Sequence, residues 1–282
     1  MRLVTYRFKD RTTYGAVAGD GIVDLGRRIG QKYPDIRAVL AAGALAEAAK
    51  AAEGQAPDAK LGEITFLPVI MNPDKILMAG VNYHSHRSEM GRTEVQHPTI
   101  FARFAESQVG HLQPMLLPKE SERFDYEGEL AVIIGKEGRR IPKERALDHI
   151  AGYSCYNDGS IRDWQRHTSQ WIPGKNYTAT GGFGPWMVTA DEIPDPTTLT
   201  LITRLNGEEM QKSTTDLLIF DIPTLINYCS TFTRLVPGDV IVSGTPGGVG
   251  AARNPPVWMK AGDTVEIDIS KVGVLKNPIV AE

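Results

Sequence analysis

The chain has 282 residues, of which 41% are hydrophobic and 23% are charged, as in an ordinary globular protein. Its 31 lysines and arginines against 34 aspartates and glutamates give a formal net charge of −3, so no basic excess points to nucleic acid or an anionic membrane as a partner. No stretch approaches the roughly 20 apolar residues of a transmembrane helix, and the N-terminus lacks the apolar block of a signal peptide. We therefore expect a cytoplasmic protein whose two cysteines, Cys155 and Cys229, are reduced and buried.

The first 70 residues are predicted to form a small α/β domain. Alternating residues over 3–8 and the turn signal at 19–21 indicate a β-hairpin or meander over residues 1–25. Ile36, Val39 and Leu40 fall at i, i+3 and i+4, and the alanines that follow favour a helix over 36–52. A break at 53–57 ends this helix, and residues 68–73 look like a linker. We place the domain boundary near residue 70.

The rest of the chain is rich in predicted strands. Apolar or alternating runs indicate strands over 75–81, 129–135, 153–157, 199–205, 239–243 and 264–269. Asn206-Gly207 is the strongest hairpin signal. Helices are predicted only over 143–150 and 222–235, besides short turns. Many strands with few helices predict a strand-rich α+β fold with a barrel or roll of mixed strands, not a doubly wound sheet.

Two glutamates, Glu127 and Glu129, form the sharpest local pattern. They stand at i and i+2 where the apolar run 130–135 begins, so on a strand they project from one face, about 7 Å apart. Carboxylates that point the same way repel each other unless a cation lies between them, and a hard divalent cation is the usual partner. A solvated strand start gives the same pattern, so the pair alone leaves both interpretations open.

Asp158 adds a third carboxylate to this pattern. It closes the apolar segment 153–156, where a buried strand would deliver it to a sheet edge or barrel end. Two glutamates and an aspartate leave about three of six octahedral positions for water and substrate. Arg162 and Gln165 follow at helical spacing. Asp158 is alternatively the N-cap of that helix, and the two roles are compatible.

The segment 80–91 carries a candidate general base. A strand is predicted to end at Val81, followed by a short helix with Gly91 as its C′ residue. His86 and Glu89 lie at i and i+3, where the carboxylate can orient the imidazole and raise its basicity. A surface histidine in a helical ion pair has the same spacing. His84 is a competing candidate, without a carboxylate at i+3.

Two loops farther along offer groups for a substrate. Lys175, between a Pro-Gly turn and a glycine-rich stretch, suits the neutralisation of an enolate or carboxylate oxygen, although an ordinary loop lysine fits equally. The segment 243–250 lacks the Gly-Lys-Ser/Thr ending of a P-loop. We expect it to form a tight loop that brings backbone amides and the Thr245 hydroxyl near a ligand carboxylate.

In this order and spacing, these segments resemble the fumarylacetoacetate hydrolase family, including its acylpyruvate hydrolase-like and 2-hydroxyhepta-2,4-diene-1,7-dioate isomerase-like members. The resemblance covers about residues 75–250 and extends weakly to the C-terminus. The matching motifs are Gly80-x-Asn82-Tyr83-x-x-His86-x-x-Glu89, Asp125-Tyr126-Glu127-x-Glu129-Leu130, Asn157-Asp158, Arg162-Asp163-x-Gln165, Gly174-Lys175 and Gly244-Thr245-Pro246-x-Gly248-Val249-Gly250. It implies a mixed β-roll catalytic domain over 71–282, preceded by the small N-terminal α/β domain over 1–70, and usually a homodimer.

The resemblance also implies roles for individual residues. The positions that match the family's metal carboxylates, for one Mg²⁺ or Mn²⁺ per chain, are Glu127, Glu129 and Asp158. His86 and Glu89 match a dyad that activates water. The positions that match contacts to the substrate or its oxyanion are Lys175, Arg162, Gln165 and Thr245. Arg103 and the segments 110–118 and 176–182 depart from relatives, and they fall where substrate choice would be set.

We therefore expect a metal-dependent hydrolase that cleaves a C–C bond in a small β-diketo or α-keto acid, such as an acylpyruvate or fumarylpyruvate. The same carboxylates would serve an oxaloacetate-type decarboxylase, an isomerase or a hydratase, because all four reactions pass through an enolate or its equivalent. A non-catalytic, metal-dependent binder of keto acids is the alternative from another class. The intact His86–Glu89 pair argues against it.

Overall fold

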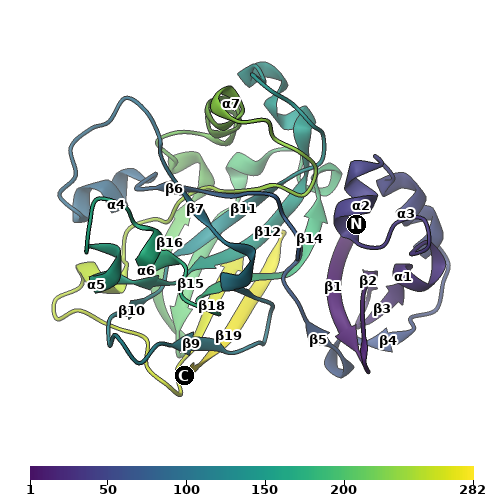
Figure 1. Cartoon of the computed structure of the whole chain (residues 1–282), viewed down its shortest axis with the longest axis horizontal. Coiled ribbons are helices and arrows are strands. Elements are labelled where there is room, and N and C mark those ends of the chain that lie inside the picture. The colour runs from purple at the N-terminus through teal and green to yellow at the C-terminus, as the bar shows by residue number, and fades with distance from the viewer.

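The structure is a computed structural model that describes residues 1–282, and it is built on one large mixed sheet (Figure 1). The strand order is β4-β3-β2-β1-β14-β12-β11-β17-β6-β7, with β5 beside β1 and β8 beside β14. These strands are Arg2–Phe8 (β1), Arg11–Ala18 (β2), Gly21–Asp24 (β3), Ala59–Lys60 (β4), Thr65–Phe66 (β5), Ile76–Gly80 (β6), Thr99–Arg103 (β7), Gln108–Val109 (β8), Gly128–Ile134 (β11), Ile150–Asp158 (β12), Gly181–Thr189 (β14) and Val240–Val242 (β17). Most neighbours are antiparallel, but β6 runs parallel to β17 and β8 parallel to β14.

A second sheet packs on the large one opposite β11, β12 and β14. Its order is β16-β15-β18-β19-β9, with strands Met115–Leu117 (β9), Thr200–Leu205 (β15), Glu208–Thr214 (β16), Thr264–Ile269 (β18) and Gly273–Ala281 (β19). Asn206 and Gly207 turn β15 into β16 with φ of 54° and 84°, the left-handed pair that this dipeptide favours. A short pair, Phe124–Asp125 (β10) and Ser160–Ile161 (β13), lies beside them. Strands hold 36% of the residues and helices 24%, so the predicted strand-rich α+β fold with mixed strands is confirmed.

The helices are short and lie at the periphery (Figure 1). The α-helices are Leu25–Arg28 (α1), Ile36–Ala41 (α2), Leu45–Ala52 (α3), His84–Glu89 (α4), Arg162–Gln165 (α5), Ile172–Lys175 (α6) and Ile222–Phe232 (α7). The 3-10 turns are Leu61–Glu63, Ala105–Ser107, Lys143–His149, Ala190–Glu192, Pro196–Thr198, Thr215–Leu217 and Gly250–Ala252. The continuous helix over 36–52 was a wrong prediction, because Gly43 takes a φ of 63° and separates α2 from α3. No helix is long and apolar enough to cross a membrane.

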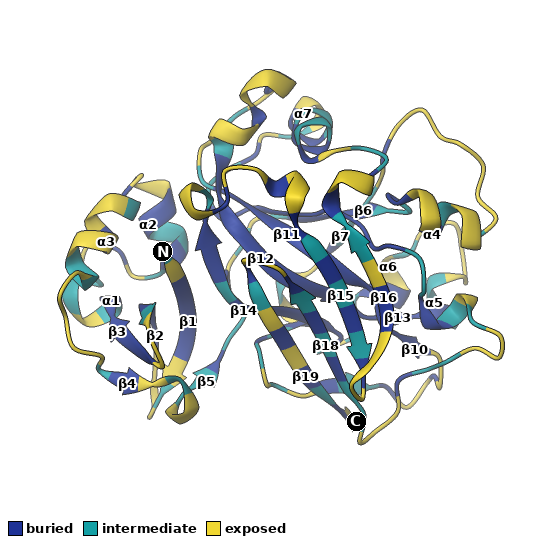
Figure 2. Cartoon of the chain, turned by 180° about the vertical axis from the view of Figure 1, so that it is seen from behind, coloured by how far each residue is buried: buried dark blue, intermediate teal, exposed yellow.

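The central strand β11 is buried on both faces and separates two cores. Leu130, Val132 and Ile134 belong to the larger core beneath the second sheet. Ala131 and Ile133 face the other way and join a cluster that includes residues of the N-terminal segment, such as Leu3 and Val39. Figure 2 shows the result, with buried central strands and exposed outer helices. The expected boundary near residue 70 therefore falls between β5 and β6, in a chain whose sheet and second core continue across it.

Candidate metal and active site

Three carboxylates meet where β11 begins and β12 ends. The two strands are antiparallel with Gly128 opposite Asn157, so Glu127 and Glu129 at one end lie beside Asp158, the last residue of β12. All three side chains are buried, and their ligand oxygens lie within 4.8 Å of one another. The structure thus brings together the three carboxylates that the sequence singled out.

Lys175 is buried against two of these carboxylates. Its Nζ donates to Glu127 Oε2 at 2.8 Å, to Asp158 Oδ2 at 2.6 Å and to the Ser160 hydroxyl at 2.7 Å. An ammonium group has three donors, so all three are engaged. The lysine sits at the end of α6, and its stem passes the Phe101 ring, whose centroid lies 5.1 Å from Nζ. Lys175 therefore acts as a fixed positive charge behind the carboxylates.

Two buried arginines complete the ionic frame. Arg162, the first residue of α5, reaches Glu127 Oε1 at 2.6 Å and Asp125 Oδ2 at 2.8 Å. Arg103, at the end of β7, donates to Asp158 Oδ1 at 2.6 Å. Both guanidinium groups lie out of solvent, where an unpaired charge is strongly unfavourable. Glu127 and Asp158 are thus held by cations on more than one side.

Glu129 differs from its two neighbours because no cation pairs with it. Its Oε2 accepts only the backbone N–H of Gly244, at 2.6 Å. Burial, together with the charges of Asp158 and Glu127, raises the pKa of Glu129 well above its ordinary value. Burial also acts on Glu127, but Arg162 and Lys175 outweigh it and lower the pKa of that group. Glu129 is thus the one carboxylate of the three whose ionised form no cation of the protein offsets, and an all-oxygen donor set with such a group fits a hard divalent cation.

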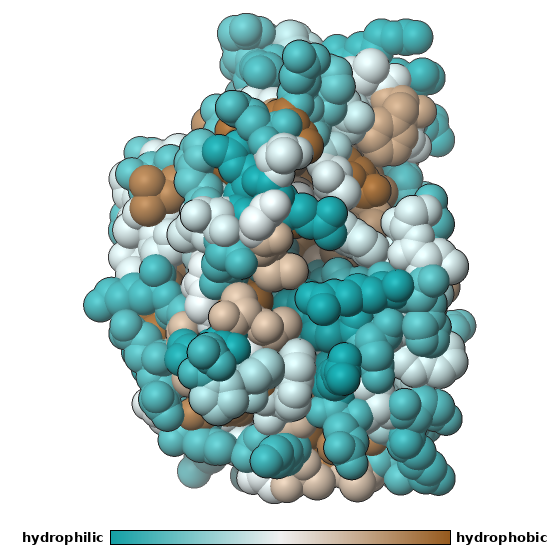
Figure 3. All heavy atoms as spheres, turned by 90° about the vertical axis from the view of Figure 1, so that its left-hand side faces the viewer, coloured by the Kyte–Doolittle hydropathy of each residue, from teal (hydrophilic) through white to brown (hydrophobic).

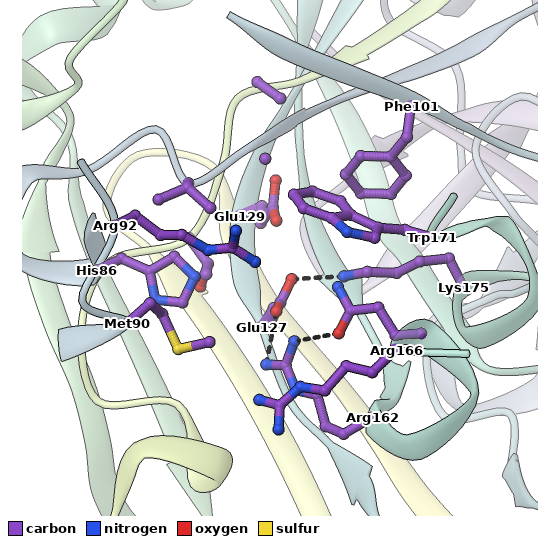
Figure 4. A pocket seen from close by; sticks show the side chains of 15 residues that line it. His86, Met90, Arg92, Phe101, Glu127, Glu129, Arg162, Arg166, Trp171 and Lys175 are labelled. Atoms are coloured by element: carbon purple, nitrogen blue, oxygen red, sulfur yellow. Dashed lines mark hydrogen bonds and ion pairs between the residues drawn. The ribbon is translucent and has the colours of Figure 1, made fainter. Parts of the chain in front are cut away.

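The predicted dyad lies on α4 above the carboxylates. His86 Nδ1 is 2.6 Å from Glu89 Oε1, and the histidine ring is buried and lines the pocket in front of Glu127 and Glu129 (Figure 4). With Nδ1 bonded to a carboxylate, the imidazole presents Nε2 as the free ring nitrogen. His84, the competing candidate, is exposed and lies 3.3 Å from Arg87. Gly91 follows α4 with a φ of 60°, as predicted.

The loop 243–250 binds the protein's own carboxylates. Gly244 N–H donates to Glu129, and Gly248 N–H donates to Glu89 Oε2 at 2.7 Å. The Thr245 hydroxyl donates to the Gly128 carbonyl oxygen at 3.0 Å. A Cβ at Gly248 would lie 2.3 Å from the Met210 carbonyl oxygen, and its φ of 101° favours glycine. This loop therefore ties the metal carboxylates to the dyad, although Thr245 does line the pocket.

Gln165 joins the site through Arg162. Its Oε1 accepts from Arg162 Nη1 at 3.0 Å, which leaves the amide nitrogen to donate into the pocket that Gln165 lines. All nine residues singled out from the sequence thus lie in one region. Asp158 is not a helix N-cap, however, because β13 intervenes and Ile161 holds that position in α5. That alternative was wrong.

Sequence reasoning missed the role of Asp125. This residue is fully buried, and burial raises its pKa against the opposing charge of Arg162. Its oxygens accept from the N–H groups of Gly250 and Ala251 as well as from Arg162. Arg103 was noted only as a departure from relatives. Asp125 and its partner Arg162 are 37 residues apart in the chain, and Arg103 and its partner Asp158 are 55 residues apart. A local sequence pattern therefore does not indicate these contacts.

Comparison with known proteins gives the chain a family. The profile of the fumarylacetoacetate (FAA) hydrolase C-terminal domain matches residues 75–280. Oxaloacetate tautomerase FAHD2A, mitochondrial, from Bos taurus is 42% identical over 228 residues, which are 80% of this chain and 73% of the relative.

Two solved structures share the fold over the whole chain. 5-Carboxymethyl-2-hydroxymuconate delta-isomerase from Mycobacterium smegmatis is 30% identical, with a TM-score of 0.79 and coverage of 100% of both chains. Maleylpyruvate hydrolase from Sphingobium sp. SYK-6, solved in complex with manganese (II) ion and pyruvate, is 30% identical, with a TM-score of 0.83 and coverage of 100% of this chain and 99% of the other. These relatives are enzymes, and they include a hydrolase, an isomerase and a tautomerase. This chain belongs to the fumarylacetoacetate hydrolase family.

Proposed function

We propose that this protein is a divalent-metal-dependent hydrolase that cleaves a C–C bond in a small β-diketo acid of the acylpyruvate type. One observation carries the proposal: a histidine–glutamate dyad faces the same pocket as a buried carboxylate triad. The related maleylpyruvate hydrolase was solved with manganese (II) ion and pyruvate, which supports both the metal and the product. Mg²⁺ and Mn²⁺ both suit a set of carboxylate oxygens.

Glu127, Glu129 and Asp158 would hold the metal. When bound, a divalent cation supplies Lewis-acid polarisation of the keto oxygen and neutralises the negative charge that develops there. Lys175 keeps Glu127 and Asp158 in place and adds a positive charge beside them. Gln165 and Arg162 also line the pocket, where the free amide nitrogen of Gln165 orients the substrate.

His86 is the proposed general base. Glu89 holds Nδ1, so Nε2 accepts a proton from a water molecule in the pocket. The resulting hydroxide attacks the distal carbonyl carbon, the bond between that carbon and the pyruvate methylene breaks, and its electron pair becomes the enolate of pyruvate. Protonation of the enolate carbon by the imidazolium restores His86. The balance is one water consumed, with one carboxylic acid and one pyruvate formed.

Oxaloacetate tautomerisation is the second candidate, favoured by the 42% identity to a protein of that name. It needs only proton transfer between carbon and oxygen, and His86 is placed for that as well. Decarboxylation of oxaloacetate and isomerisation of a keto-dienoic acid would use the same enolate-stabilising groups. None of these three reactions needs an activated water, and this difference separates them from hydrolysis.

The test is a turnover screen of the purified protein with Mg²⁺ or Mn²⁺. Acetylpyruvate and maleylpyruvate are offered, and pyruvate release is followed with lactate dehydrogenase, beside the ultraviolet decay of enol-oxaloacetate and oxaloacetate decarboxylation. We expect metal-dependent pyruvate release that His86→Ala abolishes, while most oxaloacetate decarboxylation is spared. His84→Ala, on the same helix but pointing outward, is the matched control.

Each outcome of the screen decides between the candidates. Tautomerisation or decarboxylation without pyruvate release from any acylpyruvate would replace the hydrolase assignment. Equal loss of hydrolysis and decarboxylation in His86→Ala would refute the proposed division of labour. Metal-dependent keto-acid binding without any turnover would leave a binding protein.

A further inference from the structure

Two arginines at the mouth of the pocket have no anionic partner. Arg92 follows α4 and Arg166 follows α5, and both side chains are exposed. Neither takes part in an ion pair or a side-chain hydrogen bond, whereas Arg162 and Arg103 form ion pairs with buried carboxylates. Arg92 and Arg166 have no role in the proposed hydrolase mechanism.

Both arginines line the same cavity as Glu127 and Glu129 of the carboxylate triad. Figure 4 shows them on two sides of the pocket. An adjoining outer hollow shares Arg92 and Arg166 with the inner pocket and is otherwise lined by neutral residues. The only carboxylates that line either hollow are Glu127 and Glu129, and the proposed metal takes their charge.

One wall of the cavity is aromatic (Figure 4). Phe101 and Trp171 meet edge to face, with ring centroids 5.3 Å apart, and both line the inner and outer hollows. Gly80 leaves room for the indole, because a Cβ there would lie 2.3 Å from Trp171. The cavity thus has an ionic floor, an aromatic side wall and two unpaired arginines at its mouth. Figure 3 views the side of the molecule that carries α4 and α5, and its surface is mostly hydrophilic.

We propose that Arg92 and Arg166 bind the far carboxylate of a dicarboxylic substrate. This inference rests on the proposed function, which places the α-keto acid end of the ligand at the triad. A short carbon chain then passes Phe101 and Trp171, and the distal group reaches the arginines. The planar guanidinium fork matches a carboxylate with two parallel hydrogen bonds. The acyl product of cleavage consequently leaves as a dicarboxylic acid.

The test uses two ligands that differ only at the far end. 2-Oxoadipate and 2-oxohexanoate have the same chain length, but only the first ends in a carboxylate, and neither is a β-diketo acid that hydrolysis would consume. Calorimetric binding to the Mn²⁺-loaded protein should favour 2-oxoadipate by about tenfold or more. Arg92→Gln with Arg166→Gln should reduce that ratio to about twofold, which corresponds to the small energies of exposed charge interactions. The affinity for 2-oxohexanoate should stay unchanged.

A charge-matched control removes two arginines elsewhere. Arg139 and Arg234 are exposed, with a backbone carbonyl and Glu137 as their respective contacts. Arg139→Gln with Arg234→Gln should retain the full preference for 2-oxoadipate. The proposed subsite would be overturned if the wild-type protein lacked that preference. It would also be overturned if the double variant of Arg92 and Arg166 bound both ligands more weakly by the same factor.

The enzymatic readout separates this inference from the proposed function. The double variant Arg92→Gln with Arg166→Gln should have a KM for maleylpyruvate about tenfold higher than the wild type and an unchanged kcat/KM for acetylpyruvate. Cleavage of acetylpyruvate and maleylpyruvate with equal KM would remove the subsite and keep the hydrolase. Preferential binding of 2-oxoadipate without cleavage of any acylpyruvate would keep the subsite and remove the hydrolase.

Discussion

The floor and the rim of the pocket are built in opposite ways. The floor (Glu127, Glu129, Asp158, Lys175 and Arg162) is buried, and both of its cations form ion pairs with carboxylates. The rim consists of α4 and the residues that follow α4 and α5. It is attached to the loop 243–250 by two partly exposed hydrogen bonds, Gly247 N–H to Ser85 and Gly248 N–H to Glu89.

This contrast separates two levels of function. Apart from Glu129, the floor cannot lose one charge without leaving another unpaired in a dry environment, so the proposed metal binding and enolate stabilisation would change together. Apart from the buried His86, most polar residues of the rim, such as His84, Arg92 and Arg166, are exposed, and local opening of such segments is easier than opening of a core.

The strongest test of the floor is Glu129→Gln. Glu129 has no cation partner, and no cation of the protein offsets its ionised form. The variant should therefore lose Mn²⁺ affinity by a factor larger than the roughly 10–100-fold typical of groups around metal ligands, and its activity should fall as well. The metal-free variant should remain folded, because a repulsion between carboxylates is removed. Calorimetry with Mn²⁺ and thermal melting measure both. Unfolding of the metal-free variant would contradict this account, and Glu137→Gln on the surface is the control.

Asp125→Ala breaks the floor by another route. It leaves Arg162 buried without one of its two carboxylates and frees the N–H groups of Gly250 and Ala251. Removing one partner of a buried ion pair lowers the free energy of unfolding by about 3–5 kcal/mol. Urea unfolding of the metal-free protein measures this. A loss below about 1 kcal/mol, the range of exposed pairs, would show that the floor is less rigid than its contacts indicate.

Glu89→Gln tests the rim alone. The amide keeps the size of the side chain but loses the charge that stabilises a protonated His86, so kcat for acylpyruvate hydrolysis should fall about 10²-fold, the lower end for general-base catalysis. Mn²⁺ affinity should stay within a factor of about two, because Glu89 contacts His86 and Gly248 and none of the three carboxylates. Substitution of a residue that hydrogen-bonds to a metal ligand changes metal affinity far more. A parallel loss of metal binding would mean that floor and rim are not separate.

His111 lies outside both regions and gives a baseline. Burial, and secondarily the charge of Lys276, lowers its pKa from 6.5 to about 4, and its Nδ1 accepts the Lys276 N–H at 3.0 Å. Because the unfolded chain takes up the proton first, stability from this group is fully present above pH 6.5 and is lost as the pH falls toward 4. With some solvent screening, the loss is about 2 kcal/mol. His111→Gln should flatten the pH dependence of urea unfolding by that amount, without a change in Mn²⁺ affinity, and an unaltered slope would refute this assignment.

Local patterns revealed the parts of the molecule that local forces determine. The turn at Asn206-Gly207 and the left-handed Gly91 follow from backbone preferences of single residues. The triad was visible because Glu127 and Glu129 share a strand face and Asp158 ends an apolar run. The prediction of one continuous helix over 36–52 was wrong because it gave more weight to the alanine-rich pattern than to Gly43. The left-handed backbone of Gly43 ends the first helix.

The ionic frame escaped prediction for a different reason. Asp125, Arg103 and Ser160 look like ordinary polar residues in sequence, and their importance arises only when the fold removes water from them. The loop 243–250 was expected to face a ligand carboxylate, whereas its amides bind Glu129 and Glu89. Which of two carboxylates an amide selects depends on three-dimensional packing that residue types alone do not encode.

The junction between β1 and β14 has a consequence for the exposure of a sheet edge. β1 pairs with β14 through Arg2–Val188 and Leu3–Met187, while β8 covers Gly181 and Gly182 at the other end of the same strand. Without the N-terminal segment, part of β14 would become a bare edge with unpaired backbone donors and acceptors, a template for aggregation. The small unit thus serves as a cap on the sheet that carries Asp158, and it protects that sheet from joining strands of other chains.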